Sequence, residues 1–211
     1  MRKGEETRGR ILEIAEAAVL AKGFGATSIE EIIAEAGITK SGFFYHFRDK
    51  NELARAMIIR YDEANRQLLE STFKRAEQLA DKEPLQTLLI GLKLFAETMA
   101  DLPNGHPGCL IASITYQERL FDREVVRLMK ESVQFWNDFF AKRIEAAAQL
   151  HGYIEQDEVA ELSRMIYCIV DGGIVLGRAL LDPNILPEQI LMVRCYIKML
   201  FQPVTAARRA A

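Results

Sequence analysis

Residues 27–53 read TSIEEIIAEAGITKSGFFYHFRDKNEL, and this stretch decides the fold of the N-terminal part of the chain. Ser28 followed by Glu31 is a helix-capping pair, and Gly37 ends the short apolar-patterned helix that they begin. A turn over residues 37–39 leads into a second short helix, expected from Lys40 to His46. Two short helices joined by a turn that begins with glycine are typical of a helix-turn-helix, because glycine adopts the left-handed conformation at little cost.

The second of these helices has an unusual composition for a buried helix. Its first turn holds Lys40, Ser41 and Gly42, and a run of aromatic residues and one histidine follows over residues 43–47. Such a helix can place its first turn in the major groove of DNA while some of its aromatic side chains anchor it to its own domain. We interpret Phe43 and Phe47 as anchors of this kind, so the stretch predicts a DNA-binding unit.

Helical periodicity dominates the remainder of the chain, and no stretch alternates apolar and polar residues long enough to predict a strand. Further helices are expected at about 6–22, 49–79, 84–101, 109–119, 122–150, 156–181 and 187–202, and residues 205–211 are expected to fray. The strongest break is the stretch 102–108, LPNGHPG. The predicted fold class is all-α with about nine helices, in which a three-helix domain at 1–50 precedes a helical domain at 51–211.

Composition permits a nucleic-acid partner without requiring one. The net charge is −3, and Lys40, His46 and Arg48 lie in a stretch from 36 to 48 that has no acidic residue. The three cysteines, at 109, 168 and 195, lack ligand spacing and are expected to be reduced and mostly buried. No signal sequence or membrane span is evident, so a cytoplasmic protein is expected.

Residues 7–57, with the quoted stretch at their centre, resemble the DNA-binding signature of the tetracycline-repressor (TetR) family. The caps, the turn glycine, the aromatic cluster and the lysine after it all agree with that signature. The resemblance implies that base edges or groove walls are contacted by Thr39, Lys40, Gly42 and Phe44, and that phosphates are held by Ser28, Tyr45, His46 and Lys50. Phe44 departs from the family, which commonly has tyrosine there, so thymine-methyl packing replaces a hydroxyl contact.

The resemblance also implies that residues 51–211 bind a ligand. Large apolar residues there exceed what a spacer needs, and the predicted lining is Phe95, Met99, Leu110, Ile114, Trp136, Phe140, Tyr167 and Asp171. For each of the apolar residues taken singly, an ordinary packed core is the better explanation. Asp171 lies inside an apolar helix and therefore needs a partner from the protein or a ligand. Since residues 105–118 contain no Lys or Arg, the expected inducer is neutral or cationic and largely apolar.

Subunit association is the second role that the resemblance implies for this region. In the family the last two helices of each subunit form the dimer interface, and the predicted interface residues are Gly173, Gly177, Ile197 and Phe201. Glycine in a helix interior costs about 1 kcal/mol relative to alanine, which close approach of another helix can offset. Packing within one chain is the alternative explanation for these glycines.

The predicted function is a ligand-responsive transcriptional regulator, most simply a repressor that binds a palindromic operator as a homodimer and is released by a small-molecule inducer. A helical enzyme is one alternative, because His106 and Cys109 lie close in sequence, but no orienting group accompanies them. Nor do His106, Cys109 and His151 have metal-ligand spacing, so no metal or other cofactor is expected. A module that uses a helix-turn-helix only as a scaffold is the other alternative, which Lys40, Tyr45 and Lys50 disfavour.

Overall fold

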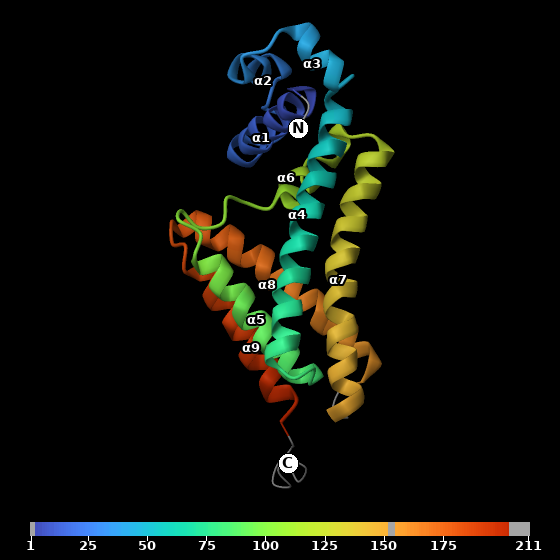
Figure 1. Cartoon of the computed structure of the whole chain (residues 1–211), viewed down its shortest axis with the longest axis vertical. Helices are drawn as coiled ribbons and strands as arrows, with labels where there is room; N and C mark the ends of the chain where they lie inside the picture. Colours follow the sequence, from blue (N-terminus) through green and yellow to red (C-terminus); the bar gives the residue numbers. More distant parts are fainter. Residues whose placement is uncertain (1–2, 152–154, 203–211) are drawn as a thin grey trace. The chain divides into compact units, whose positions relative to one another are not determined.

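The computed structural model describes residues 3–151 and 155–202, and within them the chain forms nine α-helices, one 3₁₀ turn and no strand (Figure 1). The all-α prediction is therefore confirmed. The helices are α1 (Lys3–Lys22), α2 (Ile29–Ala36), α3 (Lys40–His46), α4 (Lys50–Leu79), α5 (Pro84–Ala100), α6 (Leu110–Thr115), α7 (Arg123–His151), α8 (Gln156–Leu180) and α9 (Ile185–Leu200), with the 3₁₀ turn η1 at Glu118–Leu120.

Most helix boundaries lie within a few residues of their predicted positions, and two differences are informative. The helix expected at 109–119 is divided into α6 and η1, which are separated by Tyr116 and Gln117. The last helix begins at Ile185 rather than at Pro187, because proline is tolerated in the first turn of a helix, where its missing N–H group is not needed. The expected fraying of 205–211 concerns residues outside the described part of the chain.

The chain divides into two compact units, and each contains two segments of sequence. Unit 1 comprises residues 1–67 and 107–134, and unit 2 comprises residues 68–106 and 135–211. This division differs from the boundary predicted at residue 50, because the first part of α4 and the whole of α6 pack with the first three helices. The helices α4 and α7 are each continuous and contribute residues to both units.

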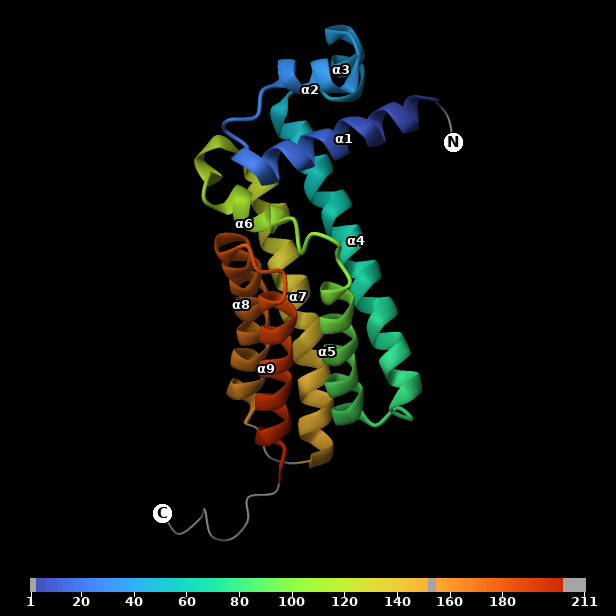
Figure 2. The ribbon, with the colours of Figure 1, turned by 90° about the vertical axis from the view of Figure 1, so that its left-hand side faces the viewer.

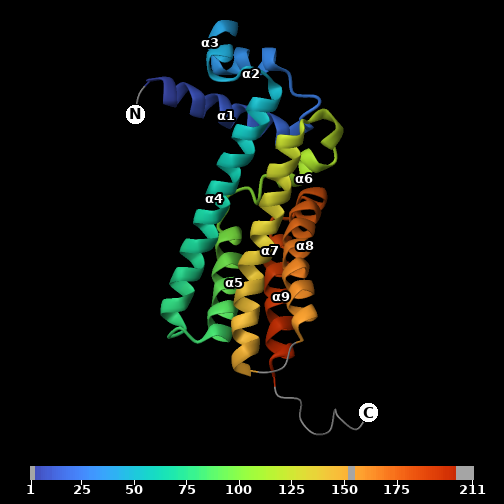
Figure 3. The ribbon, with the colours of Figure 1, turned by 90° about the vertical axis from the view of Figure 1, so that its right-hand side faces the viewer.

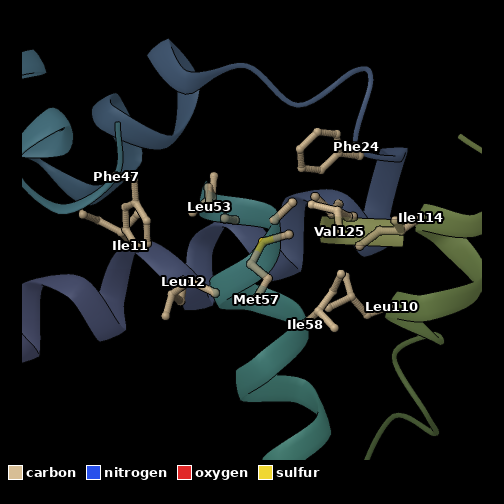
Figure 4. Close-up of a cluster of buried hydrophobic side chains, with 14 of the residues drawn as sticks. Ile11, Leu12, Phe24, Phe47, Leu53, Met57, Ile58, Leu110, Ile114 and Val125 are labelled. Atoms are coloured by element: carbon tan, nitrogen blue, oxygen red, sulfur yellow. The ribbon is translucent and has the colours of Figure 1, made fainter. Parts of the chain in front are cut away.

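Unit 1 has a core built from side chains of α1, α2, α3, α4, α6 and the first turns of α7, part of which Figure 4 shows. Ile11 of α1, Met57 of α4 and Leu110 of α6 are fully buried in it, and Phe47 closes it beside the end of α3. Burial of one such side chain stabilises a fold by about 1.5–3 kcal/mol. Long-range packing of this kind, rather than the intrinsic stability of two very short helices, therefore holds α2 and α3 in place.

In unit 2 the helices α5, α8 and α9 lie side by side (Figures 2 and 3). The buried side of α9 carries Ile190, Val193 and Ile197. A glycine allows a close approach at one position in α5: a Cβ atom added to Gly91 would lie 2.3 Å from Cε1 of Phe73. The aromatic ring of Phe73 therefore needs the absence of a side chain at Gly91 in order to pack there.

The structure also bears on the predicted burial of the cysteines and on the predicted absence of a membrane span. The cysteines are less buried than predicted, because Cys168 and Cys195 are exposed and only Cys109 is partly covered. Among the helices in the described ranges, none is long and apolar enough to cross a membrane.

Candidate nucleic-acid interface

The geometry of the helix-turn-helix follows from local capping. The hydroxyl of Ser28 accepts a hydrogen bond from the N–H group of Glu31 at 3.1 Å and so begins α2. Gly37 ends α2 with a φ of 63°, and its N–H group bonds to carbonyls in the last turn. The hydroxyl of Thr39 then accepts from the N–H group of Gly42 at 3.1 Å and begins α3. Both predicted caps of α2 are therefore confirmed, and Thr39 acts as a cap in addition to its predicted contact role.

The aromatic residues of α3 divide into a buried and an exposed set. Phe43 and Phe47 are buried in the core of unit 1, as predicted. Phe44 is 41% exposed although it follows Phe43 directly, and Tyr45 is 83% exposed. An exposed phenylalanine and an exposed tyrosine, side by side on one short helix, are available to a partner and contribute little to the fold.

Other residues of α3 that are predicted to contact DNA are at least partly exposed. Lys40 is exposed, and its ammonium group lies 4.0 Å from a carboxylate oxygen of Glu30. His46 is partly buried and packs edge-on against the ring of Tyr45, with the ring centroids 5.0 Å apart. Gly42 is partly exposed, and a Cβ atom added there would lie 3.3 Å from the Thr39 hydroxyl oxygen. The α2–α3 segment therefore presents Thr39, Lys40, Phe44 and Tyr45 together.

Lys50 has a structural role that the sequence did not indicate. Its Nζ donates to the carbonyl oxygen of Phe24 at 2.9 Å and lies 4.6 Å from the centroid of the Phe24 ring. Burial lowers the pKa of the Lys50 ammonium group. Lys50 thus joins the start of α4 to the segment that follows α1, and its remaining ammonium protons are those available to a phosphate.

Polar contacts also join the start of α4 to residues after α6 within unit 1. Arg55 pairs with Asp122, with 2.5 Å between nitrogen and oxygen, and the side chain of Asn51 accepts from the N–H group of Asp122 at 3.1 Å. Gln117 accepts from the N–H group of Gly25 at 2.7 Å. These side chains were absent from the predicted site. They were hard to find because each is an ordinary surface residue type whose partner lies far away in sequence.

Six of the eight predicted ligand-lining residues belong to unit 2, and four of them form an aromatic cluster. The Trp136 ring lies 6.0 Å from those of Phe140 and Tyr167 and 6.1 Å from that of Phe95, centroid to centroid. Met99 is also buried in unit 2. Leu110 and Ile114 are instead fully buried in the core of unit 1 (Figure 4), so other side chains of that core already cover them. Their predicted role in ligand binding stays a prediction.

Asp171, the sixth of these residues, has a carboxyl group that is partly buried. One buried oxygen of its carboxyl group has no hydrogen-bond partner among the residues that the structure describes. His106 interacts with it electrostatically: burial lowers the pKa of the His106 ring, the Asp171 carboxylate raises it, and Arg178 lowers it. The sequence did not indicate an interaction between His106 and Asp171, because it depends on how α8 packs.

Three of the four predicted interface residues, Gly173, Ile197 and Phe201, are buried within the subunit, and the role of the four in dimerisation stays a prediction. Ile197 is 0% exposed and Phe201 is almost fully buried. A Cβ atom added to Gly173 would lie 3.1 Å from the Leu186 side chain, and one added to Gly177 would lie 3.1 Å from the Asp182 carbonyl oxygen. Intrachain packing of α8, α9 and their connection therefore accounts for all four residues.

A different set of apolar residues is exposed on α8 and α9. We define the α8/α9 face by the exposed residues Cys168, Val175, Leu176, Leu191, Met192, Cys195, Tyr196 and Met199. Gly172 lies among them on α8, and a Cβ atom added to it would meet no atom within 4 Å. The signal in the sequence was a second apolar series on α9, at 192, 196 and 199, next to the buried series at 190, 193 and 197. Periodicity alone does not say which series faces inward.

Comparison with known proteins agrees with this geometry. Residues 11–57 match the family model for "Bacterial regulatory proteins, tetR family". The regulator TtgR of Pseudomonas putida is 36% identical over 56 residues, which are 26% of this chain and 27% of TtgR, so the match spans about a quarter of that relative. An uncharacterised helix-turn-helix regulator of Lactococcus lactis is 24% identical over 189 residues, 89% of this chain and 91% of the relative.

The fold is also found among solved structures. A TetR-family transcriptional regulator of Agrobacterium tumefaciens superposes with a TM-score of 0.76 at 17% identity, over 93% of this chain and 98% of that one. The fold and the exposed α2–α3 segment define the class of the protein: an all-α protein with an N-terminal helix-turn-helix of the kind found in bacterial regulators. Within this fold, residues 11–57 carry the DNA-binding domain of the tetR family of bacterial regulatory proteins.

Proposed function

We propose that this protein is a ligand-responsive transcriptional regulator that binds a palindromic DNA operator as a homodimer and is released by a small-molecule inducer. The observation that carries the DNA-binding part is the division of the α3 aromatics. Phe43 and Phe47 hold the helix on its unit, while Lys40, Phe44 and Tyr45 remain exposed on it. Side chains of these types reach base edges and phosphates when a recognition helix enters the major groove.

Dimerisation is supported by the α8/α9 face of unit 2. Met192 is 62% exposed and Leu176 is 50% exposed, and both lie on helices whose other sides are already buried. Exposed apolar residues on two helices that pack together favour association with another protein surface. A two-fold axis through the α8/α9 face would make it self-complementary, and the operator would then contain two half-sites about one DNA turn apart.

The proposed inducer binds beside the aromatic cluster of unit 2. Trp136, Phe140 and Tyr167 supply apolar surface, and the unpartnered oxygen of Asp171 accepts a hydrogen bond from a ligand donor. This chemistry suits a largely apolar molecule with a neutral or cationic donor group. The helices α4 and α7 are each continuous and contribute residues to both units. A ligand that alters their packing in unit 2 would therefore also alter the part of these helices that packs in the core of unit 1.

Repression needs only that the occupied operator overlaps a promoter, so it is the simplest regulatory outcome of this arrangement. Selection of bound fragments from random DNA by the purified protein tests the proposal. We expect enrichment of a palindrome, with affinity that falls steeply as salt increases. Failure to enrich any sequence, with binding of all fragments alike, would contradict the proposed function.

A further inference from the structure

Unit 2 contains a pocket that the proposed function does not use. It lies at the turn between α4 and α5, next to α7, and has a volume of about 410 Å³. Three cationic side chains line it, from Lys82, Lys142 and Arg143, against one carboxylate, that of Glu77. The chain as a whole has a net charge of −3, so this local excess of positive charge runs against the average of the protein.

The ammonium groups of the two lysines in this pocket make no polar contact with the described part of the chain. Both side chains are exposed. Within residues 3–151 and 155–202, the ammonium groups of Lys82 and Lys142 form no hydrogen bond and no ion pair. Lys82 lies in the turn itself, held by a hydrogen bond of 3.0 Å from its N–H group to the Glu77 carbonyl oxygen. The backbone is therefore anchored while the charged group stays available.

Thr87 adds a buried hydroxyl group to the lining. The residue is only 6% exposed, and its Oγ1 has no hydrogen-bond partner among the described residues. A threonine within a helix often donates to the carbonyl group four residues earlier, but here the N–H group of Thr87 bonds to that carbonyl, of Glu83, at 2.8 Å and the hydroxyl does not. A buried hydroxyl without a partner is costly, so an acceptor from outside the chain would stabilise it.

Arg143 provides a second buried donor with a fixed orientation. Its guanidinium carbon lies 3.6 Å from the centroid of the Phe139 ring and 4.9 Å from that of Phe73, and Nη1 donates to the Phe139 carbonyl oxygen at 2.8 Å. The Nε atom is buried and has no partner among the described residues. Burial lowers the pKa of this guanidinium, which the carboxylates of Glu77 and Glu70 partly counteract. The stacked rings thus fix the guanidinium beside the pocket, with one buried N–H group that lacks an acceptor among the described residues.

From these groups we infer that the pocket at the α4–α5 turn is a binding site for a small oxyanion, a carboxylate or a phosphate. The Nε–H group of Arg143 and the hydroxyl of Thr87 donate to the anion, and the ammonium groups of Lys82 and Lys142 neutralise its charge. Water would satisfy the two buried donors but would leave the excess positive charge of the lining, three cations against the Glu77 carboxylate, uncompensated. The site lies on other residues than the aromatic cluster, so the anion is a second ligand beside the proposed inducer.

Titration calorimetry of the full chain tests this inference, with inorganic phosphate and citrate as separate probes and sodium chloride at matched ionic strength as the reference. We expect saturable binding of one probe or both: phosphate alone identifies a phosphate site, and citrate alone a carboxylate site. Replacing both lysines, Lys82→Gln with Lys142→Gln, should weaken binding by about ten-fold or more, since two charge-assisted contacts are lost. Thr87→Val, which keeps the shape of the side chain, should weaken it by about five-fold.

Lys74→Gln is the matched control, because Lys74 is an exposed lysine of the same unit outside the pocket and should leave the affinity unchanged. The inference is overturned if neither probe binds saturably, or if the Lys82/Lys142 double variant and Thr87→Val both bind like the original protein. Circular dichroism confirms that each variant is folded. Operator binding is measured separately, so a negative result here leaves the proposed function standing.

Discussion

Neighbouring residues of α3 lie in different environments. Substitutions at these residues should therefore affect different properties, either the packing of the core or the contact with DNA. Phe43 is fully buried and Phe44 is 41% exposed, although they have the same side chain. Replacement of Phe43 removes core packing, whereas replacement of Phe44 removes only a contact surface. The same contrast holds between Lys40, which is exposed, and Lys50, which is anchored to the Phe24 carbonyl group.

The two lysines give a prediction about DNA binding. Lys40→Ala should weaken binding to the selected operator and change its sequence preference, with little effect on stability. Lys50→Ala should weaken binding to all sequences alike. It should also destabilise the fold by about 1–3 kcal/mol, because the Phe24 carbonyl oxygen loses its charged donor and keeps only the N–H group of Thr27. Fluorescence anisotropy and urea denaturation measure the two effects, with Lys74→Ala as control. Unchanged operator affinity in both variants would remove these residues from the proposed interface.

Asp62 gives a prediction about pH. Burial raises the pKa of its carboxyl group, the hydrogen bond from the Ser132 hydroxyl and the charge of Arg66 lower it, and Glu131 raises it. The folded state therefore binds this proton more tightly than the unfolded chain does. Consequently, the contribution of Asp62 to stability is most favourable below the ordinary aspartate pKa of about 3.9 and is lost as the pH rises through the higher folded-state pKa.

Asp62→Asn keeps an oxygen for the Ser132 hydroxyl and removes the charge, so it should raise the free energy of unfolding at pH 7 but not at pH 3. Denaturation in urea at both pH values measures the difference. Equal effects at the two pH values would show that folding does not raise the pKa of Asp62, and a loss of stability at pH 7 alone would show that Asp62 is stabilised as a carboxylate.

At the scale of secondary structure, α9 shows how one helix serves two surfaces. Ile190, Val193 and Ile197 pack inside unit 2, and Met192, Tyr196 and Met199 are exposed one step around the helix. The first series stabilises the subunit by itself. The second is free to meet another subunit, so substitutions in the two series should be distinguishable by experiment.

Met192→Glu should convert the proposed dimer to a folded monomer, because a charge placed in an apolar interface is strongly unfavourable. Ile197→Glu should instead unfold the subunit, since Ile197 has no exposed surface. Light scattering reports the mass, and circular dichroism reports the fold. A Met192→Glu variant that remains dimeric would place the subunit contact on another surface.

For the whole molecule, regulation requires thermodynamic linkage between the inducer and the operator. An inducer lowers operator affinity only if it binds the DNA-free form more tightly, and a coupling of about 1–3 kcal/mol raises the operator dissociation constant roughly 5- to 150-fold. Trp136 is the only tryptophan and lies in the aromatic cluster, so an inducer should change its fluorescence.

Phe140→Ala should weaken the fluorescence response while the inducer-free protein keeps its operator affinity, because Phe140 packs against Trp136 within unit 2. A fluorescence titration, followed by anisotropy with labelled operator at saturating ligand, measures both quantities. Ligands that bind tightly near Trp136 and leave operator affinity unchanged would exclude this form of regulation.

The sequence by itself determined the features that depend on local interactions. The caps at Ser28 and Gly37 and the extents of α2 and α3 follow from contacts within a few residues, and the all-α class follows from periodicity along the chain. These interactions have the same partners whatever the rest of the chain does. For this reason the helix-turn-helix and its resemblance to the TetR family are evident from the sequence.

Only the tertiary structure decided which apolar side chains are buried and which polar groups meet. Ile197 was expected at an interface and is internal, and Met192 was overlooked and is exposed, because two apolar series on one helix are equivalent until its neighbours are placed. Likewise, Arg143 and Thr87 lie 56 positions apart in sequence, and only the packing of α5 and α7 brings them to one pocket. Such contacts depend on where whole helices lie, which short-range sequence patterns do not encode.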